Sequence, residues 1–263
     1  KDPDVAHFST YVGRGAIRFY LPLSVQLANP FVSQIVVVAK DIAARDRLQL
    51  SLEKTLAVQF PEVVSRVAPL EMGPPVGWPL QYRVTGPDKD EVRKIALELA
   101  QVMGSDTRTR YINYDWMEPA RQLRVKVNQD QARQLGISSA ALAGALNAAV
   151  TGTAVTQVRD DIYLVNVVAR ATDAERVSMQ SLAALQVPTP SGRMVPLKQF
   201  ASFVEEQEFP LVWRRDRVPT LTVRADVLPG VLPDTVVAAL APKIEAFAAK
   251  LPQRYRVETG GLY

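Results

Sequence analysis

The sequence has no cysteine and only one histidine, His7, among its 263 residues. Without cysteine the fold cannot rely on disulfides, and thiol nucleophiles are excluded. No G-x-S-x-G turn is present, so nucleophilic triads have no candidate members. His7 stands in a predicted strand, where a structural role is favoured over general-base chemistry. We therefore expect a protein that is not an enzyme and that needs no cofactor.

Long hydrophobic runs and a strong charge imbalance are also missing. The longest apolar patches, such as Ile35 to Ala39 and Ser139 to Val150, fall short of the roughly 20 residues that a membrane helix needs. No apolar segment typical of a signal peptide follows Lys1. The net charge of +4 is spread along the chain, which is weak support for a polyanionic partner. A hydrophobic content of 48% suffices for two or more domain cores.

What the sequence does contain is a repeated unit. Each copy has a strand, a short connection, an amphipathic helix and a strand that begins with basic residues; the copies span Gln34–Val67, Trp78–Tyr114 and Thr220–Thr259. Paired units of this kind form a four-stranded sheet with two helices on one face, the split βαβ or ferredoxin-like layout. Val5 to Val12 is predicted to be the last strand of a fourth copy, so we expect a chain cut from a larger protein.

Periodicity supports this interpretation of the repeat. In the second copy Asp88 with Glu91 forms an N-terminal capping pattern, and the apolar face of the predicted helix contains Val92, Ile95, Leu99 and Val102. In the third copy apolar and polar residues alternate from Thr220 to Asp226, as expected for a sheet with helices on one side. The opposite, polar face can line a cleft. The first copy is predicted to end in a strand from Val63 to Val67.

A different segment, from about Glu118 to about Phe209, interrupts the series. It begins with a predicted strand and a short helix capped by Asn128; Gly136 ends this helix and Ser138 caps the next one. A hairpin follows, with Ala154–Val158 paired to Tyr163–Val168 and a solvated turn at Arg159–Asp161. Short strands are expected at Leu185–Pro188 and Met194–Leu197. The fold class is therefore α+β, with repeated ferredoxin-like subdomains, the first incomplete, and an inserted α+β subdomain.

Helix-turn-helix spacing at Ala132, Gly136 and Leu142, together with the basic pI, suggests a DNA-binding alternative. A recognition helix needs polar and cationic side chains for base edges and phosphates. The helix that begins at Ser139 offers almost none of them, so no nucleic-acid partner is expected.

The run Asn128 to Ser138, NQDQARQLGIS, resembles the D-x-x-x-A-x-x-L-G-[VIL]-[ST] signature in periplasmic loops of resistance-nodulation-division (RND) efflux transporters. A G-x-x-V-P-L stretch begins at Gly192, and the ending LPQRYRVETGG resembles the family's L-P-x-G-Y-x-x-x-x-x-G, with Arg254 where the family usually has Gly. The docking motif then falls on Ala132, Leu135, Gly136, Gly152, Asp160 and Asp161.

The resemblance implies a domain organisation. It is to the family's second large periplasmic loop, although the first loop has the same layout. Residues 1–75 would form a partial first porter subdomain. Residues 76–117 and 209–263 would form the second porter subdomain, and 118–208 the inserted docking subdomain.

The resemblance also implies a function. Such pumps are proton-driven homotrimers of the bacterial inner membrane that bind small lipophilic compounds and work with a periplasmic adaptor and an outer-membrane channel. Their proton-relay residues lie in membrane helices outside this chain. We therefore expect the periplasmic part of a multidrug efflux pump.

Motif register places the family's cargo-binding positions near the start of the chain. They are Phe8, Tyr11, Arg14, Phe19, Tyr20 and Val36, and a switch loop that divides the drug pockets falls on Gly13, Arg14 and Gly15. Val36 stands where well-studied members carry Phe. The structural alternatives are that Phe8 is a core residue of its strand and that Phe19 and Tyr20 anchor a loop.

Two other cargoes stay open. Relatives that export heavy metals use methionine ligands, which suit monovalent copper. The methionines here are scattered, with Met103 and Met194 expected to pack in a helix face and a strand; the others are Met72, Met117 and Met179. We therefore expect organic cargo, with metal ions or lipids as the alternatives.

Overall fold

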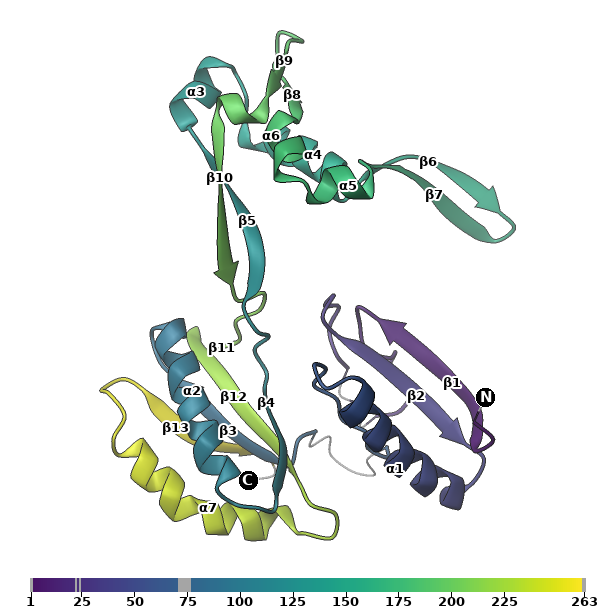
Figure 1. Ribbon diagram of the computed structural model, residues 1–263, viewed down its shortest axis with the longest axis vertical. Coiled ribbons are helices and arrows are strands. Elements are labelled where there is room, and N and C mark those ends of the chain that lie inside the picture. The colour runs from purple at the N-terminus through teal and green to yellow at the C-terminus, as the bar shows by residue number, and fades with distance from the viewer. Residues whose placement is uncertain (1, 22, 24, 71–76, 262–263) are drawn as a thin grey trace. The chain divides into compact units, whose positions relative to one another are not determined.

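The computed structural model describes residues 2–21, 23, 25–70 and 77–261. The chain divides into two compact units (Figure 1). Unit 1 combines residues 1–118 with 209–263, and unit 2 contains residues 119–208. The sequence of unit 1 is thus interrupted once, between its second and third repeats.

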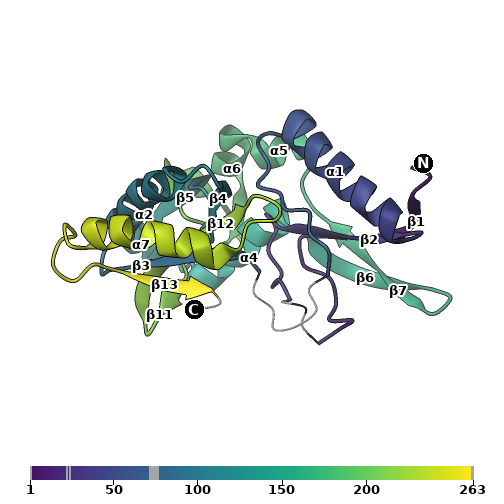
Figure 2. The ribbon, with the colours of Figure 1, turned by 90° about the horizontal axis from the view of Figure 1, so that it is seen from below.

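The second and third repeats of unit 1 form one antiparallel sheet. Its strands are β3 (Leu80–Thr85), β4 (Thr109–Tyr114), β12 (Val218–Val227) and β13 (Arg256–Gly261). They lie in the order β13–β3–β12–β4, and the short β11 (Arg214–Arg215) pairs with the start of β12. Helices α2 (Lys89–Gly104) and α7 (Pro233–Ala248) lie on the same side of the sheet (Figure 2). This arrangement is the predicted split βαβ layout.

The core of this subdomain lies between the sheet and the two helices. Its buried residues come mainly from β3, β12, α2 and α7, and they include Leu80, Val84, Leu99, Leu221 and Leu240. Asp88 caps α2, because its carboxylate accepts hydrogen bonds from the backbone N–H groups of Asp90 and Glu91 at 2.9 Å. The indole N–H of Trp116 donates to the Thr220 carbonyl at 2.9 Å, so this buried ring leaves no polar atom unsatisfied.

The first repeat forms a smaller layer. Strands β1 (Val5–Val12) and β2 (Ser33–Ala39) pair antiparallel, and helix α1 (Ile42–Gln59) follows. Asp41 caps α1, because its carboxylate accepts a hydrogen bond from the Ala44 backbone N–H at 2.7 Å.

The strand predicted from Val63 to Val67 is absent, and this part of the prediction is wrong. The segment has no regular structure. Its side chains rather than its backbone make the contacts: Val63 and Val64 line a pocket, and the Arg66 guanidinium pairs with Asp226 of β12 at 3.4 Å. Backbone groups of the segment therefore do not enter a sheet.

Unit 2 contains short elements around a small core. The elements are β5 (Ala120–Val127), α3 (Gln129–Gln134), α4 (Ser139–Val150), β6 (Thr153–Asp160), β7 (Tyr163–Ala169), α5 (Asp173–Val177), α6 (Met179–Ala184), β8 (Gln186–Pro188), β9 (Met194–Pro196), a 3-10 turn (Leu197–Gln199) and β10 (Ala201–Glu208). Strand β5 pairs with β10, β6 with β7, and β8 with β9. The core includes Val187, Val195, Leu197 and Phe200.

Three elements of unit 2 escaped the sequence analysis: α5, α6 and β10. Strand β10 is rich in glutamate, and its ladder partner β5 lies about 80 residues earlier, so neither hydrophobic pattern nor local pairing indicated it. Arg124 of β5 pairs with Glu206 and Glu208 of β10, and its positive charge offsets part of the negative charge of β10. No helix in the described part of the chain is long and apolar enough to cross a bilayer.

Candidate ligand-binding site

The predicted switch loop lies between β1 and β2 and is closed by its own backbone. The N–H of Gly13 donates to the Val32 carbonyl at 2.9 Å, and the N–H of Asn29 donates to the Gly13 carbonyl at 2.9 Å. Gly15 donates to the Gln26 carbonyl at 3.2 Å, and a β-carbon on Gly15 would lie only 2.8 Å from the Gln26 β-carbon. A side chain at position 15 would therefore separate the two arms of the loop.

The predicted cargo residues do not share one surface. In the β1–β2 register Phe8 lies opposite Val37, whereas Val36 lies opposite Ser9. Because side chains alternate across a sheet, Phe8 points to one face while Tyr11 and Val36 point to the other. Phe8 is 65% exposed and belongs to neither hydrophobic core of the described residues. Its role in cargo binding stays a prediction.

The other predicted cargo residues lie in the loop itself. Phe19 and Tyr20 are neighbours whose ring centroids are 5.4 Å apart at a tilt of 36°. The Tyr20 carbonyl accepts a hydrogen bond from the Leu23 backbone N–H at 3.2 Å, and Leu23 is buried. Arg14 is exposed. The loop thus presents one cation and two neighbouring rings.

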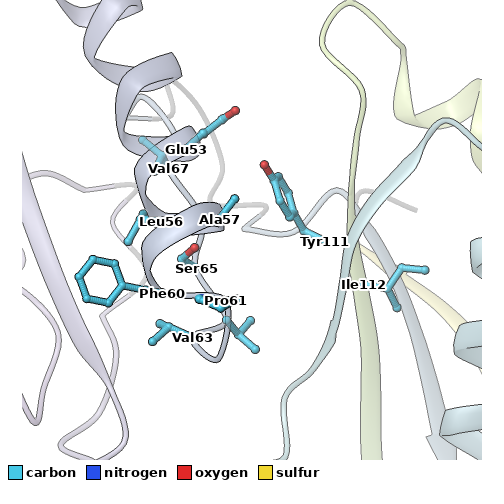
Figure 3. Close-up of a pocket in the computed structure, with 11 residues that line it drawn as sticks. Glu53, Leu56, Ala57, Phe60, Pro61, Val63, Ser65, Val67, Tyr111 and Ile112 are labelled. Carbon is cyan, nitrogen blue, oxygen red and sulfur yellow. The ribbon is translucent and has the colours of Figure 1, made fainter.

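A pocket of about 260 Å3 lies elsewhere in unit 1, beside the C-terminal end of α1 (Figure 3). We call it the α1–β4 pocket. None of the predicted cargo residues lines it. Its walls are mainly apolar and include Leu56, Ala57, Phe60, Val63, Val64 and Val67. The Tyr111 ring of β4 points toward α1, and Ile112 points away from it (Figure 3).

Paired charges stand at the β4 side of this pocket. The Arg110 guanidinium lies 3.5 Å from Glu53 and 4.0 Å from Asp226, and Asp226 also pairs with Arg66 at 3.4 Å. All four side chains are at most a quarter exposed. Of these four residues Glu53 lines the pocket, and its carboxylate is paired with Arg110. Such a pocket suits lipophilic molecules better than small ions.

Tyr111 owes its direction to a β-bulge. Arg110 pairs with Asp226 and Asn113 pairs with Arg224, so two residues of β4 stand opposite one residue of β12. Tyr111 has a φ of +53°, and the Asn113 side-chain amide donates to its carbonyl at 2.8 Å. Sequence analysis missed this residue, because nothing in TRYINY indicates a left-handed conformation.

The sheet face away from α2 and α7 is polar, as predicted, and it holds an aromatic ring between two cations. The guanidinium carbons of Arg66 and Arg224 lie 5.3 and 5.7 Å from the Trp78 ring centroid. Burial lowers the pKa of Arg224. Burial also raises the pKa of Asp115, which accepts a hydrogen bond from the Thr222 backbone at 2.8 Å.

The residues of the predicted docking motif have clear structural roles in unit 2. Ala132 is buried in the core and Leu135 packs against it. Gly136 has a φ of +70°, which ends α3 in the left-handed conformation as predicted. Gly152 has a φ of +98°, and a β-carbon there would lie 2.6 Å from a Val168 methyl. Whether these residues also dock a partner stays a prediction.

The predicted hairpin turn is partly wrong. Arg159 and Asp160 belong to strand β6, and the turn consists of Asp161, at a φ of +52°, and Ile162. Tight two-residue turns require positive φ, which Asp tolerates better than most residues. Every residue of β6 and β7 is exposed.

The methionines lie in unrelated surroundings. Met103 is fully buried in the core of unit 1, as predicted, whereas Met194 is 53% exposed and the expectation that it packs in a strand is wrong. Met72 lies outside the described residues. Among the residues that the structure describes, no group of three or more His, Asp or Glu side chains could hold a metal ion.

The ferredoxin-like subdomain with a second unit inserted between β4 and β12 has the fold of the porter region of RND pumps. The chain belongs to the AcrB/AcrD/AcrF family, whose sequence profile matches residues 39–263. No curated protein matches the chain.

Two solved structures of a heavy metal efflux pump, in different crystal forms, are similar to it. One has a TM-score of 0.69 at 23% identity over 98% of this chain, and the other a TM-score of 0.74 at 21% identity over 99%. The chain spans 27% of the length of these pump chains. At this identity the likeness concerns the fold.

Proposed function

We propose that this chain is the substrate-binding and docking portion of a proton-driven efflux pump of the bacterial inner membrane, and that it lies in the periplasm. Family membership over residues 39–263 supports this proposal, as does the fold shared with RND pumps. The work of the chain is binding and conformational change rather than covalent chemistry. The proton pathway would belong to other parts of the pump.

Lipophilic organic compounds are the proposed cargo. The observation that carries this choice is the α1–β4 pocket, whose walls are mainly apolar and whose charged lining residue, Glu53, is already paired with Arg110. A pump that exports many compounds should depend little on directional contacts such as hydrogen bonds. A pocket with mainly apolar walls meets this requirement. Heavy-metal ions are the second candidate, because both similar structures are described as a heavy metal efflux pump.

Assembly follows from the same family membership. We propose a homotrimer that works with a periplasmic adaptor and an outer-membrane channel, with unit 2 as the docking part. The fully exposed β6–β7 hairpin supports a contact role for unit 2, because an isolated two-stranded ribbon is marginally stable in water and gains from being covered.

Deleting the gene that encodes this chain tests both cargo proposals. Cells without it should retain more N-phenyl-1-naphthylamine, a neutral lipophilic dye, and a plasmid copy should restore the lower level. Silver(I) and copper(I) sensitivity should stay unchanged. Unchanged dye retention with increased silver sensitivity would replace the organic proposal by the metal one. Calorimetry with silver(I), repeated on Met72→Ala, would then locate the ligands.

A further inference from the structure

Among the non-glycine residues with positive φ in the described part of the chain, Tyr111 alone lies outside a turn. Five non-glycine residues in the described part of the chain have positive φ, namely Tyr111, Asp161, Asp216, Arg217 and Arg254. Four of them lie in turns, where chain reversal requires that conformation. Tyr111 lies inside strand β4 instead. A bulky side chain at positive φ is a strained arrangement, and such strain gathers at functional sites.

The register shows what the strained residue adds. Arg110 and Asn113 pair with Asp226 and Arg224, which both lie on the polar face of the sheet. In a regular strand a single residue would lie between Arg110 and Asn113, and its side chain would point to the helix side of the sheet. Ile112 takes this role, because it packs on the core. Tyr111 is therefore the extra residue of the bulge. Its ring leaves the sheet at the edge strand and enters the α1–β4 pocket (Figure 3).

Two neighbours hold Tyr111 in place. The buried Asn113 side chain donates to the Tyr111 carbonyl at 2.8 Å, which fixes the bulge. The Arg110 guanidinium lies 4.9 Å from the Tyr111 ring centroid and is itself held by Glu53. One side of the ring is thus covered by a cation that already has a carboxylate partner. The ring also lines the pocket, whose other walls are mostly aliphatic and include Phe60 together with the polar residues Glu53 and Ser65.

We propose that Tyr111 is the specificity-determining residue of the α1–β4 pocket, and that its ring selects cargo with a planar aromatic group. This inference rests on the proposed function and narrows its cargo class. Aromatic rings stack in offset or edge-on arrangements, which aliphatic walls cannot provide. The strain at φ +53° is the cost of placing the ring there, since glycine would form the same bulge without strain.

Binding of N-phenyl-1-naphthylamine to the purified 263-residue protein, followed by dye fluorescence, tests the proposal. Tyr111→Gly should weaken binding at least tenfold while leaving the thermal midpoint equal or higher, because it removes the ring and the strain together. Tyr111→Phe should bind within about twofold of the original protein. Tyr111→Asn, which tolerates the same backbone, should lose binding as the glycine variant does, and it replaces that variant if glycine unfolds.

Two controls separate the ring from other effects. Arg254→Gly relieves a positive φ far from the pocket and should leave the dye affinity unchanged. Phe31→Ala removes another exposed ring, 56% accessible and outside the pocket, and should also leave it unchanged. Equal affinity of Tyr111→Gly and the original protein would overturn the proposal, as would the absence of saturable binding. The gene-deletion experiment is independent, so dye export without a Tyr111 effect would reject only this inference.

Discussion

Replacing Arg254 by glycine should stabilise the fold. The residue has a φ of +79° and stands third in a turn closed by a hydrogen bond from the Tyr255 N–H to the Pro252 carbonyl, at 3.1 Å. A positive φ near 80° at this place is typical of a type II turn, where glycine is the ordinary residue. The family motif that the ending of the chain resembles has Gly here. The structure thus gives a physical reason for that glycine.

The expected gain is small and positive. The left-handed backbone conformation costs an L-residue about 1–2 kcal/mol of stability. Replacement by glycine removes this cost but adds an entropic cost of roughly 0.5–1 kcal/mol, because glycine has more conformational freedom in the unfolded state. The Arg254 side chain is exposed, so its removal costs little packing. Arg254→Gly should therefore raise the free energy of unfolding by about 0.5–1 kcal/mol, which is a rise of roughly 1–4 °C in a domain of this size.

Tryptophan fluorescence is a selective assay for this change. The protein has three tryptophans, Trp78, Trp116 and Trp213, and all of them belong to unit 1, as Arg254 does. A thermal melt followed by their emission reports on unit 1 without a contribution from unit 2. The matched control is Arg256→Gly in extended strand β13, which should lower the midpoint. If both glycine variants lowered it equally, the argument from φ would be refuted.

Three further predictions use the same protein. Leu99→Ala, at a fully buried position of α2, should lower the free energy of unfolding in urea by about 2–5 kcal/mol. Leu97→Ala on the same helix, where the side chain is 43% exposed, should lower it by less than about 1 kcal/mol. Similar losses for the two variants would contradict the observed packing of α2. The side chain and backbone N–H of Arg108 hold the pKa of Asp106 to about 2. This pair therefore stabilises the fold above the ordinary pKa of 3.8, and the contribution disappears as the pH falls toward 2. NMR titration of Arg108→Ala should show the Asp106 pKa rising toward 3.8, and an unchanged value would assign the shift to another cause. Gly152→Ala should loosen the base of the β6–β7 hairpin, because its β-carbon meets Val168, and limited trypsin digestion of the hairpin should become faster; an unchanged rate would show that the hairpin tolerates the side chain.

Local patterns predicted most of unit 1. The apolar spacing of α2 and its cap at Asp88 follow from short-range physics, and the structure confirms both. In β12 the core face is as predicted, with Leu221, Val223 and Ala225 buried, but Thr220 and Thr222 of the opposite face are buried as well. The repeat then fixed the topology, since two βαβ units that share a core have few ways to pair. The absent strand at Val63–Val67 shows the limit of this reasoning. Its valines suit a strand, but they line the pocket instead.

Elements that depend on distant partners were missed. The sequence of β10 is typical of a charged surface segment. It forms a strand because β5 pairs with it through backbone hydrogen bonds and places basic side chains opposite its glutamates. The cargo prediction failed to find the α1–β4 pocket for a related reason. Its walls come from α1, the segment after it and β4, and no single stretch of sequence contains them.

Tyr111 is the clearest case of information that appears only in the register between two strands. In isolation TRYINY is an ordinary strand in which alternation would send Arg110 and Ile112 to the same face. Pairing with β12 sends them to different faces, because Asp226 and Arg224 are separated by one residue whereas their partners are separated by two. The extra residue must leave the sheet plane, and an edge strand next to an apolar pocket gives its ring a place to go. The extra residue of the bulge thus forms part of the pocket wall instead of occupying a regular strand position.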